Sequence, residues 1–456
     1  MKKVHFTCVI ALIAMVLVGC APPTTPEATP PPTTEAPTMD VSTLEGWAAY
    51  VRSKYEGVEI KVAAATHPSI EAFKKMTPKF QELTGIKVTW DEMEEGQLAD
   101  KLLLEATSGS TSYDVVMNCP EFTPALVDAG MLEPLDSWLA DAEKSPAWFE
   151  PQDVITAYRD MLSYQEKHYG IPFAGETVFL FYRKDIFEKH NLKVPQTFDE
   201  VLETAKLIEE KEPGMYGISM RTRLGWEFTY MWSVFIFPFG GRIIDPATNR
   251  PGFDLPGTLE SLKYMIELAK YGPTGIESFS FPEAWDAFMQ GKTGMMIEAS
   301  AAAPEVENPD KSVVVGKIGY APMPAGPEGA YSGVWGWGFS MTAGSQNKDA
   351  AWDFIVYLTS REKQEEYVNN GGIPSRSSWL SDATLQGQYP YYKATLDTLK
   401  QAADLQAKGL GVVIMDPRWS QISEIMGTEG AKAMAGEITP EQAVENMQAQ
   451  ISDIWK

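Results

Sequence analysis

Short apolar segments alternate with amphipathic helical segments between residues 58 and 130, and this alternation limits the possible folds more than any other feature. Three segments have the apolar character of buried strands: residues 58–64, 86–90 and 113–117. Three others have helical periodicity: residues 69–85, 98–106 and 120–129. In the first helix Ser69 is the expected cap, Pro78 a break or kink, and Gly85 the stop. Strands that alternate with helices predict an α/β lobe with a largely parallel sheet.

Helical segments dominate the remainder of the chain. Capping-box sequences at residues 197–200 and 439–442 predict two helix starts. Further helices are expected at residues 259–269 and 350–358, and a short strand at 295–297. Residues 226–239 are rich in aromatic side chains that fit both a strand and a helix, so periodicity leaves both open. A chain of 456 residues with 44% hydrophobic residues is long enough for two or three domains with buried cores.

The N-terminal segment has the order of a bacterial lipoprotein signal. Lys2 and Lys3 precede an apolar run at residues 9–18, which is too short to span a membrane comfortably. Residues 17–20 (Leu-Val-Gly-Cys) resemble a lipobox, which implies removal of residues 1–19 and a lipid on the Cys20 sulfur. The stretch that follows is rich in Pro and Thr, so residues 20–45 are expected to form an extended tether.

Composition and motifs argue against several functions. The formal net charge of −24 disfavours nucleic acid and anionic membranes as partners and suits a soluble monomer. The four histidines have no metal-ligand spacing, and Gly291-Lys292-Thr293 lacks the upstream glycine of a phosphate-binding loop because Asp286 stands there. Neither GxSxG nor GxGxxG occurs. We therefore expect no metal, no cofactor and no enzymatic activity.

Cys119 is the one cysteine outside the N-terminal targeting segments, because Cys8 and Cys20 both belong to them. The mature chain is therefore expected to have no internal disulfide. Nothing near Cys119 in the sequence offers a base that would activate its thiol, so a buried or loop thiol is the expected state.

From residue 58 to residue 455 the chain resembles the family 1 extracellular solute-binding proteins, the sugar receptors of ABC importers. Five blocks in the family's order carry the resemblance: residues 113–136 (YDVVM, then LVDAGMLEPLD), 170–187 (GIP, then FYRKDIF), 194–200 (VPQTFDE), 288–297 (FMQGKTGMMI) and 345–358 (SQNKDAAWDFIVYL). A narrower similarity to members that bind sorbitol- or mannitol-like polyols rests on shorter segments: residues 90–95, 221–226 with 240–242, 335–337 and 392–397.

The resemblance implies an α/β, two-lobed periplasmic-binding-protein-like fold of type II, with discontinuous lobes joined by hinge crossings and the ligand between the lobes. It implies crossings near residues 174–178, 318–321 and 359. The N-terminal lobe would comprise residues 58–174 and 318–360, and the C-terminal lobe residues 178–316 and 361–456. It also implies a helix for the ambiguous residues 226–239.

Aromatic side chains are the first expectation for the binding site, because sugars and polyols present C–H surface that flat rings can cover. Trp335 and Trp337 have glycine neighbours (Gly333, Gly336 and Gly338) that would let a ligand approach, although packing in the lobe core is an equal alternative. Trp226 stands at the start of the aromatic segment, where the family often has a stacking residue. Trp419 is a further stacking candidate, whereas Trp232 is expected in the core.

Polar groups are the second expectation, because ligand hydroxyls need charged or amide partners. Glu176 matches, by its position after GIP, a carboxylate that contacts sugar in maltose-type members. The other polar candidates follow predicted strands or lie in loops, where the crevice of an α/β sheet opens: His67, Asn118, Glu121, Arg221, Glu298, Ser300 and Arg376. Arg221 and Arg223 could equally be a solvated pair, and His67 could be structural.

These inferences predict an extracytoplasmic solute-binding component of an ABC importer, lipid-anchored to the outer face of the cell membrane. Its partners would be a small sugar or polyol and the permease subunits. Two alternatives stay open: a secreted glycan-active enzyme or non-transport carbohydrate-binding protein on the same fold, and a receptor for an oligosaccharide, a glycerol phosphate or a peptide.

Overall fold

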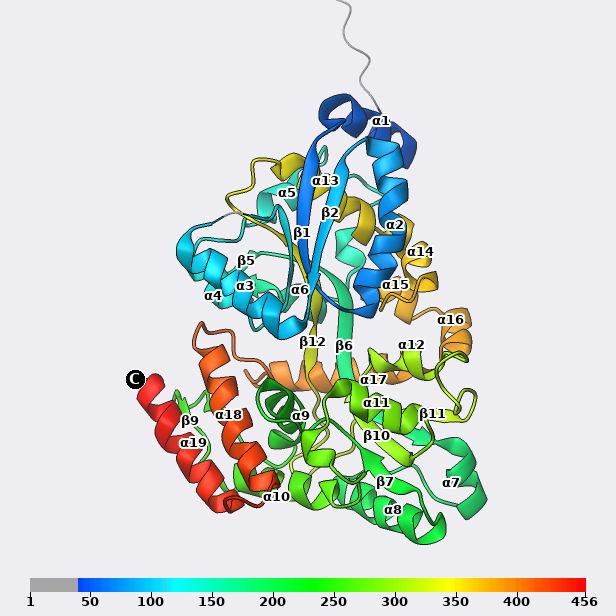
Figure 1. The fold of residues 1–456 in the computed structure, drawn as a ribbon, viewed down its shortest axis with the longest axis vertical. Coiled ribbons are helices and arrows are strands. Elements are labelled where there is room, and N and C mark those ends of the chain that lie inside the picture. The colour runs from blue at the N-terminus through cyan, green and yellow to red at the C-terminus, as the bar shows by residue number, and fades with distance from the viewer. Residues whose placement is uncertain (1–39, 111) are drawn as a thin grey trace, which may run out of the picture. The chain divides into compact units, whose positions relative to one another are not determined.

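The computed structural model describes residues 40–110 and 112–456, which fall within one compact unit. The predicted signal peptide, the lipidation of Cys20 and the tether as far as residue 39 lie outside the described residues. The described part has two lobes, and we call them the first lobe (upper in Figure 1) and the second lobe (lower in Figure 1).

The first lobe is built on a sheet with the strand order β2-β1-β3-β12-β6. Its strands are β1 Glu59–Ala65, β2 Lys87–Met93, β3 Val115–Asn118, β6 Ile171–Arg183 and β12 Val334–Met341. β1 runs parallel to β2 and β3, as the alternation of strands and helices predicted. β12 comes from much later in the chain and pairs antiparallel with β3 and β6, so it joins the early strands to the strand shared by the lobes.

Helices cover both faces of this sheet: α1 Leu44–Tyr55, α2 Pro68–Thr84, α3 Glu95–Ser108, α4 Thr123–Asp128, α5 Asp136–Ala140, α6 Thr156–Asp160, α13 Lys348–Thr359 and α14 Gln364–Asn369. Short elements lie between them: η1 Pro151–Asp153, β4 Ser163–Tyr164, β5 Lys167–His168 and η3 Arg361–Lys363. α2 ends at Gly85 with φ 73°, as predicted, but its cap is His67 instead of Ser69. The His67 ring accepts the Ser69 N–H, and Pro78 lies inside the helix without ending it.

Helix α1 differs from the expected tether, because the folded part begins well before residue 58. Thr43 caps the helix by accepting a hydrogen bond from the Gly46 N–H. Trp47 and Val51 are buried in the first-lobe core, with exposed fractions of 1% and 0%. The Trp47 ring stacks on Tyr357 of α13 at 5.9 Å between centroids. The predicted tether ended at residue 45 and the folded part was expected from residue 58, so the sequence left most of α1 unassigned. Only three residues of α1 are buried, which is too few to give a clear periodic signal.

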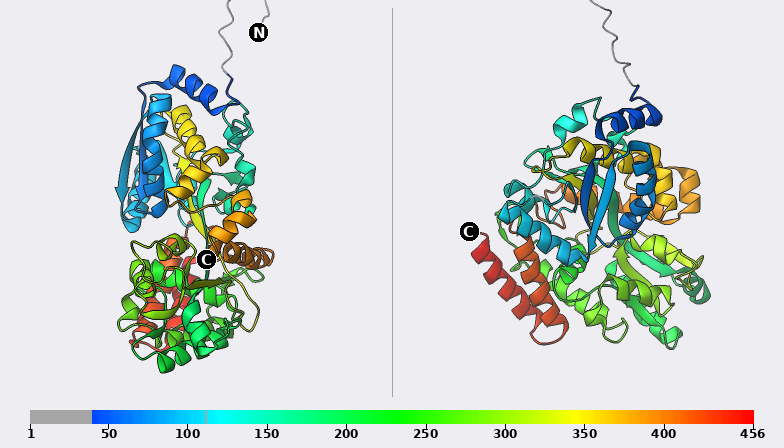
Figure 2. Two further views of the ribbon diagram at one scale, coloured as in Figure 1. Left: turned by 90° about the vertical axis from the view of Figure 1, so that its right-hand side faces the viewer. Right: turned by 45° about the horizontal axis from the view of Figure 1, so that its top comes forward.

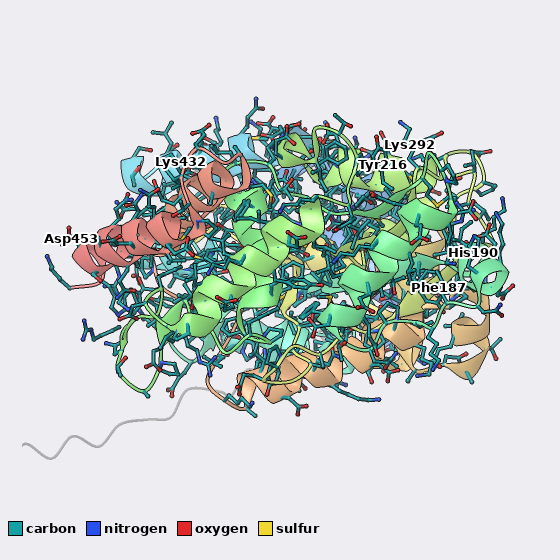
Figure 3. The ribbon with its side chains drawn as sticks, turned by 90° about the horizontal axis from the view of Figure 1, so that it is seen from below. Phe187, His190, Tyr216, Lys292, Lys432 and Asp453 are labelled. Carbon is teal, nitrogen blue, oxygen red and sulfur yellow. The ribbon has the colours of Figure 1, made fainter. Side chains whose placement is uncertain are left out.

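The second lobe contains the lower half of β6 with β7 Tyr216–Ser219, β10 Thr293–Ala299 and β11 Ile318–Ala321. Its helices are α7 Lys184–His190, α8 Phe198–Lys211, α9 Trp226–Ile236, α10 Pro256–Ala269, α11 Phe281–Met289, α12 Ala302–Val306, α18 Trp419–Met434 and α19 Pro440–Ile454, with the short elements β8 Ile244–Asp245, β9 Arg250–Pro251 and η2 Ile276–Ser278. Both predicted capping boxes form, at Thr197 and Thr439, and α9 confirms the helix at the aromatic segment. Seen from below, α18 and α19 lie at one end of this lobe and α7 at the other (Figure 3).

The side view shows the two lobes one above the other (Figure 2). The chain passes between these lobes three times. First, residues 171–177 of β6 pair with β12, whereas residues 178–183 pair with β10 and β11. Second, the chain returns between β11 and β12, later than the expected residues 318–321, because β11 still pairs with the lower half of β6.

The third passage runs along α17 Tyr391–Gln406, well beyond residue 359. Tyr391 and Tyr392 pack in the first-lobe core, whereas Leu405 packs in the second. The segment from α14 to the start of α17, which includes α15 Ser377–Leu380 and α16 Ala383–Gln388, therefore lies nearer the first lobe than the sequence suggested.

Candidate functional site

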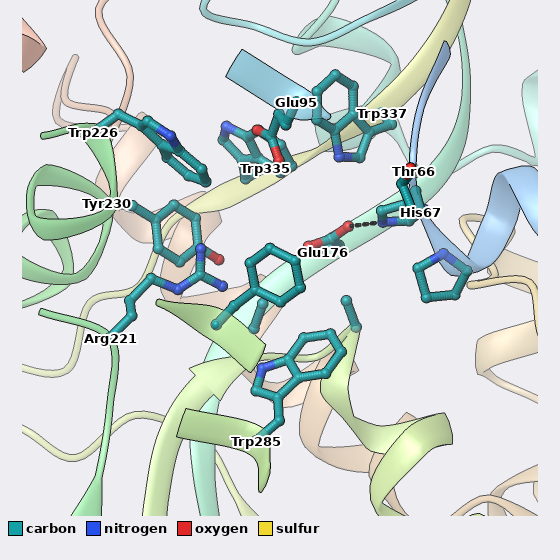
Figure 4. A pocket seen from close by; sticks show the side chains of 14 residues that line it. Thr66, His67, Glu95, Glu176, Arg221, Trp226, Tyr230, Trp285, Trp335 and Trp337 are labelled. Carbon is teal, nitrogen blue, oxygen red and sulfur yellow. Dashed lines mark ion pairs between the residues drawn. The ribbon is translucent and has the colours of Figure 1, made fainter. Parts of the chain in front are cut away.

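A pocket lies where β6 passes from one sheet to the other, and residues of both lobes line it (Figure 4). It contains about 500 Å³ that protein atoms do not fill, open solvent included. The first lobe and the shared strand β6 contribute Thr66, His67, Pro68, Glu95, Glu176, Trp335 and Trp337. The second lobe contributes Arg221, Trp226, Tyr230, Phe281, Trp285, Ala299 and Ala301.

Six of the fourteen residues that line the pocket are Phe, Tyr or Trp. Trp335 and Trp337 lie edge to face with centroids 5.0 Å apart. Tyr230 of α9 meets Trp335 edge to face at 6.1 Å, so rings of the two lobes touch across the pocket. Trp226 lies 6.4 Å from Tyr230, one helical turn away. These rings give the pocket an apolar lining that can contact the C–H surface of a ligand.

The two tryptophans of β12 point to the pocket because they are two residues apart on one strand, and alternate residues share a face. Their glycine neighbours were expected to give a ligand access to the rings, but they are needed for packing within the protein. A Cβ at Gly333 would lie 2.3 Å from Val412, and one at Gly336 would lie 2.1 Å from the carbonyl oxygen of Ala174. These glycines let β12 pack tightly against protein, and they do not open a path to the rings.

Arg221 and Glu298 form a buried ion pair at the second-lobe side of the pocket. The guanidinium donates from Nε to Oε2 at 2.9 Å and from Nη2 to Oε1 at 2.5 Å, and Glu227 lies 3.6 Å from Nη1. Burial opposes the charge on Arg221, but Glu298 and Glu227 outweigh it and raise the pKa of Arg221. The guanidinium also lies over the Tyr230 ring, 4.3 Å from its centroid.

Glu176 lies at the point where β6 leaves the first sheet, paired in register with Trp335 of β12. Its side chain is 5% exposed, and Oε1 lies 3.4 Å from Nε2 of His67 (dashed in Figure 4). That oxygen has no hydrogen-bond partner among the described residues. A buried carboxylate oxygen without a donor is costly, and here it lines the pocket, where a ligand hydroxyl could donate to it.

A second cavity adjoins the pocket, and Glu95 and Trp226 line both. We call it the side cavity. Its lining comprises Glu95, Gly96, Ala99, Glu121, Phe122, Trp226, Trp419, Ser420, Ser423 and Glu424. Trp335 donates from Nε1 to Glu121 at 2.7 Å. Burial raises the pKa of Glu95 to about 8, with the neighbouring charge of Glu121 as the second cause, and burial also raises the pKa of Glu121.

Six of the twelve expected ligand-binding residues line the pocket: His67, Glu176, Arg221, Trp226, Trp335 and Trp337. Glu121 and Trp419 line the side cavity. Glu298 is fully buried and bonds to Arg221. Trp232 is in the core as expected, where it donates to Ser261.

Three expected residues do not line the pocket, because their side chains form hydrogen bonds within the protein: Asn118, Ser300 and Arg376. Asn118 donates to the hydroxyls of Thr123 and Ser340. The Ser300 hydroxyl accepts the Thr177 N–H at 3.2 Å. Arg376 is 1% exposed and donates to the carbonyl oxygens of Phe149, Glu150 and Thr359. A loop position after two glycines suggested exposure, but the guanidinium satisfies backbone carbonyls of the first lobe.

The sequence analysis missed eight lining residues: Thr66, Pro68, Glu95, Tyr230, Phe281, Trp285, Ala299 and Ala301. Helical spacing could have found three of them. Tyr230 is four residues after Trp226 on α9, and Phe281 and Trp285 are four apart on α11, so each pair shares a helix face. Most of the others follow the carboxyl ends of β1 and β10 or begin α3, positions that need the sheet order to be placed.

These lobes and this site define a class: a two-lobed α/β binding protein of the type II periplasmic-binding-protein fold. A family model of the bacterial extracellular solute-binding proteins matches residues 64–365, and the chain belongs to that family. It is a binding protein and not an enzyme. Among the described residues, no helix is long and apolar enough to cross a membrane.

Three similar proteins illustrate the family. A probable amino-acid ABC transporter periplasmic-binding protein of Sinorhizobium fredii is 28% identical over 426 residues, 90% of this chain and 92% of that one. A mannitol-binding protein of Pseudomonas aeruginosa is 26% identical over 409 residues, 85% of this chain and 91% of that one. The crystal structure of an ABC transporter solute-binding protein from Agrobacterium radiobacter in complex with ribitol superposes with a TM-score of 0.80 at 25% identity, covering 88% of this chain and 99% of that one.

Proposed function

We propose that this chain is the extracytoplasmic component of an ABC importer and that it binds a polyol or sugar in the pocket between its lobes. The observation that carries the proposal is the combination of aromatic rings from both lobes with a buried carboxylate, Glu176, that lacks a hydrogen-bond donor. Rings cover the C–H surface of such a ligand, and the carboxylate accepts from its hydroxyls. Similar proteins named for mannitol and solved with ribitol support the same ligand class.

Binding would couple to closure of the lobes. Trp226 and Tyr230 belong to the second lobe, whereas Trp335 and Trp337 belong to the first. A ligand that touches both sets stabilises the arrangement in which they face one another, and so shifts the population toward the closed form. The permease subunits would recognise that form. We further propose a lipid on Cys20 that holds the protein, as a monomer, at the outer face of the membrane.

A free amino acid, the ligand class in the name of the Sinorhizobium relative, fits this pocket less well. An α-carboxylate needs a cation, and Arg221 is the guanidinium that lines the pocket. Its donors are directed to Glu298, and Glu227 lies beside it. Displacing either carboxylate would leave a buried charge without a partner. Polyols and sugars carry no such requirement.

A thermal-shift screen of the protein without its signal peptide tests the proposal. The panel contains four- to six-carbon polyols, monosaccharides, maltose-type oligosaccharides and the common amino acids. We expect at least one polyol or sugar to raise the Tm in a concentration-dependent way, since a ligand that binds only the folded state stabilises it by mass action. A rise with amino acids alone would refute the polyol or sugar assignment.

A further inference from the structure

The acidic side chains at the pocket outnumber the basic ones, and Arg221 does not offset the difference. Its guanidinium is committed to Glu298 through two hydrogen bonds, with Glu227 close by. Arg223 lies 3.0 Å from Glu227. The two guanidinium groups therefore neutralise the two carboxylates of the second-lobe side, and they leave no positive charge for the carboxylates on the first-lobe side.

His67 is already committed to other groups. Its Nδ1 accepts the Ser69 N–H at 3.1 Å, because the imidazole caps α2. Its Nε2 faces Glu176 Oε1 at 3.4 Å. The ring is therefore held between the start of α2 and Glu176.

In the part of the chain that the structure describes, three further carboxyl groups form no ion pair with an arginine or a lysine: Glu95, Glu121 and Glu176. They come from α3, from the loop after β3 and from β6, and they converge on the pocket and the side cavity. Glu176 is nine-tenths buried with one oxygen unpartnered. Glu95 opens a helix, where the dipole should favour its charge, yet burial beside Glu121 raises its pKa to about 8. A cation placed beside these carboxyl groups would therefore favour their ionised form.

A metal ion is not the expected occupant. Among residues 40–110 and 112–456, no group of three or more His, Cys, Asp or Glu side chains is placed to hold a metal ion. Glu95 and Glu176 instead line the pocket together with Trp226, Trp335 and Trp337 (Figure 4), and Glu121 lines the side cavity together with Trp226. Indole faces attract organic cations and also cover C–H surface, so rings and carboxylates together favour an ammonium group on a carbon skeleton.

We propose that the solute of this site is a polyol or sugar that carries a protonated amine, with the ammonium group placed among Glu95, Glu121 and the indole rings. The inference rests on the proposed function and narrows its ligand class. The hydroxyl-bearing part of the solute would lie toward Glu176 and Trp337. The ammonium supplies the positive charge that the first-lobe carboxylates lack.

Isothermal titration with matched ligand pairs tests the inference. Sorbitol is compared with 1-amino-1-deoxysorbitol, mannitol with 1-amino-1-deoxymannitol, and glucose with glucosamine, all at pH 7.5. We expect the amine of at least one pair to bind tenfold or more tightly than its neutral partner. If neutral members bind and no amine exceeds its partner, the inference is wrong and the proposed function stands. If neither these ligands nor the wider polyol and sugar panel binds, both are wrong.

Charge-removing variants locate the ammonium group. Glu95→Gln and Glu121→Gln keep the size of the side chain and should each lower the amine-to-neutral affinity ratio about tenfold. Asp100→Asn, on the same helix as Glu95 but exposed and outside both cavities, is the matched control and should keep the wild-type ratio. A thermal melt of each variant confirms that it folds. A ratio unchanged in both Gln variants would overturn the assignment.

Proton linkage gives an independent readout. The groups facing Glu95 are Glu121, Glu176 and, across the pocket, Arg221 and Glu227, with Glu424 of α18 in the side cavity. An ammonium that binds there favours the ionised carboxylate, so Glu95 releases its proton on binding. The affinity for the amine should therefore rise from pH 6 to pH 8, severalfold overall, whereas that for the neutral partner should not rise. Titrations in two buffers of different ionisation enthalpy measure the released proton, and no release would contradict the placement.

Discussion

Arg221 and Glu298 join the ends of two second-lobe strands through a doubly hydrogen-bonded ion pair, with Nε–Oε2 and Nη2–Oε1 distances of 2.9 and 2.5 Å. Arg221 follows β7 and Glu298 lies in β10. The pair holds the guanidinium over the Tyr230 ring at 4.3 Å from its centroid. One face of the ligand pocket is therefore positioned by a contact in which no ligand takes part.

The first prediction concerns this ion pair. Arg221→Met leaves the buried Glu298 without its cation, and it should lower the free energy of unfolding by about 3–5 kcal/mol. The double variant Arg221→Met/Glu298→Leu removes both charges and should recover most of that loss. Urea denaturation of the two proteins measures the difference. A double variant as unstable as the single one would show that the charge itself was not the source of the cost.

The second prediction concerns Trp226. This ring is partly exposed at the start of α9 and lines both the pocket and the side cavity, so Trp226→Ala should weaken solute binding by about 2 kcal/mol, roughly 30-fold, with a small effect on folding. Trp138→Ala is the control, because Trp138 is also partly exposed but lies on α5 outside the pocket. The test compares the affinities of the two variants for the same solute, each relative to the wild type. Equal losses would argue against a stacking role.

The third prediction concerns Asp353 and pH. Burial raises the pKa of Asp353 to about 7, although Trp47 donates a hydrogen bond to it at 3.2 Å. The unfolded chain has an ordinary pKa of about 4 at this residue, so the folded state binds more protons between these values. This group therefore costs stability as pH rises from about 4 to 7, with no further change above 7.

Asp353→Asn keeps the acceptor for Trp47 and removes the charge. Its stability relative to the wild type should increase from pH 4 to pH 7, by about 4 kcal/mol at most, and then stay constant. Chemical denaturation at a series of pH values measures this. A difference that is the same at pH 4.5 and pH 8 would show that Asp353 titrates normally in the fold.

The fourth prediction concerns helix α1. Trp47 is buried between α1 and α13, so Trp47→Ala should destabilise the protein by about 3–5 kcal/mol. Glu45→Ala, two residues earlier and exposed, should change stability by less than about 0.5 kcal/mol. Similar unfolding midpoints for the two variants would mean that α1 does not belong to the cooperative core.

The sequence predicted the fold well where the signal was local. The strands at residues 58–64, 86–90 and 113–117, the stop at Gly85 and the capping boxes at Thr197 and Thr439 all depend on neighbouring residues. The passages between lobes were harder to predict. β11 and α17 differ from the expected boundaries because strand pairing and core packing between distant segments place them.

The site shows the same division. Glu176 was proposed because a resemblance placed it after the GIP block, and Trp335 and Trp337 because of their glycine neighbours; all three line the pocket. Arg376 was misplaced because its partners, the carbonyl oxygens of Phe149, Glu150 and Thr359, are brought to it only by folding. The imbalance of charge between Arg221 and the first-lobe carboxylates likewise depends on which groups pair with which, and composition does not contain that information.

Titration calorimetry of the wild type and of Trp335→Ala, with the polyol or sugar that most stabilises the protein, tests the central claim most directly. The account predicts saturable binding of one solute per chain in the wild type and at least a tenfold loss of affinity in the variant, which still melts cooperatively. A folded variant that binds as tightly as the wild type would show that the solute does not lie against the β12 indoles, and it would contradict the account.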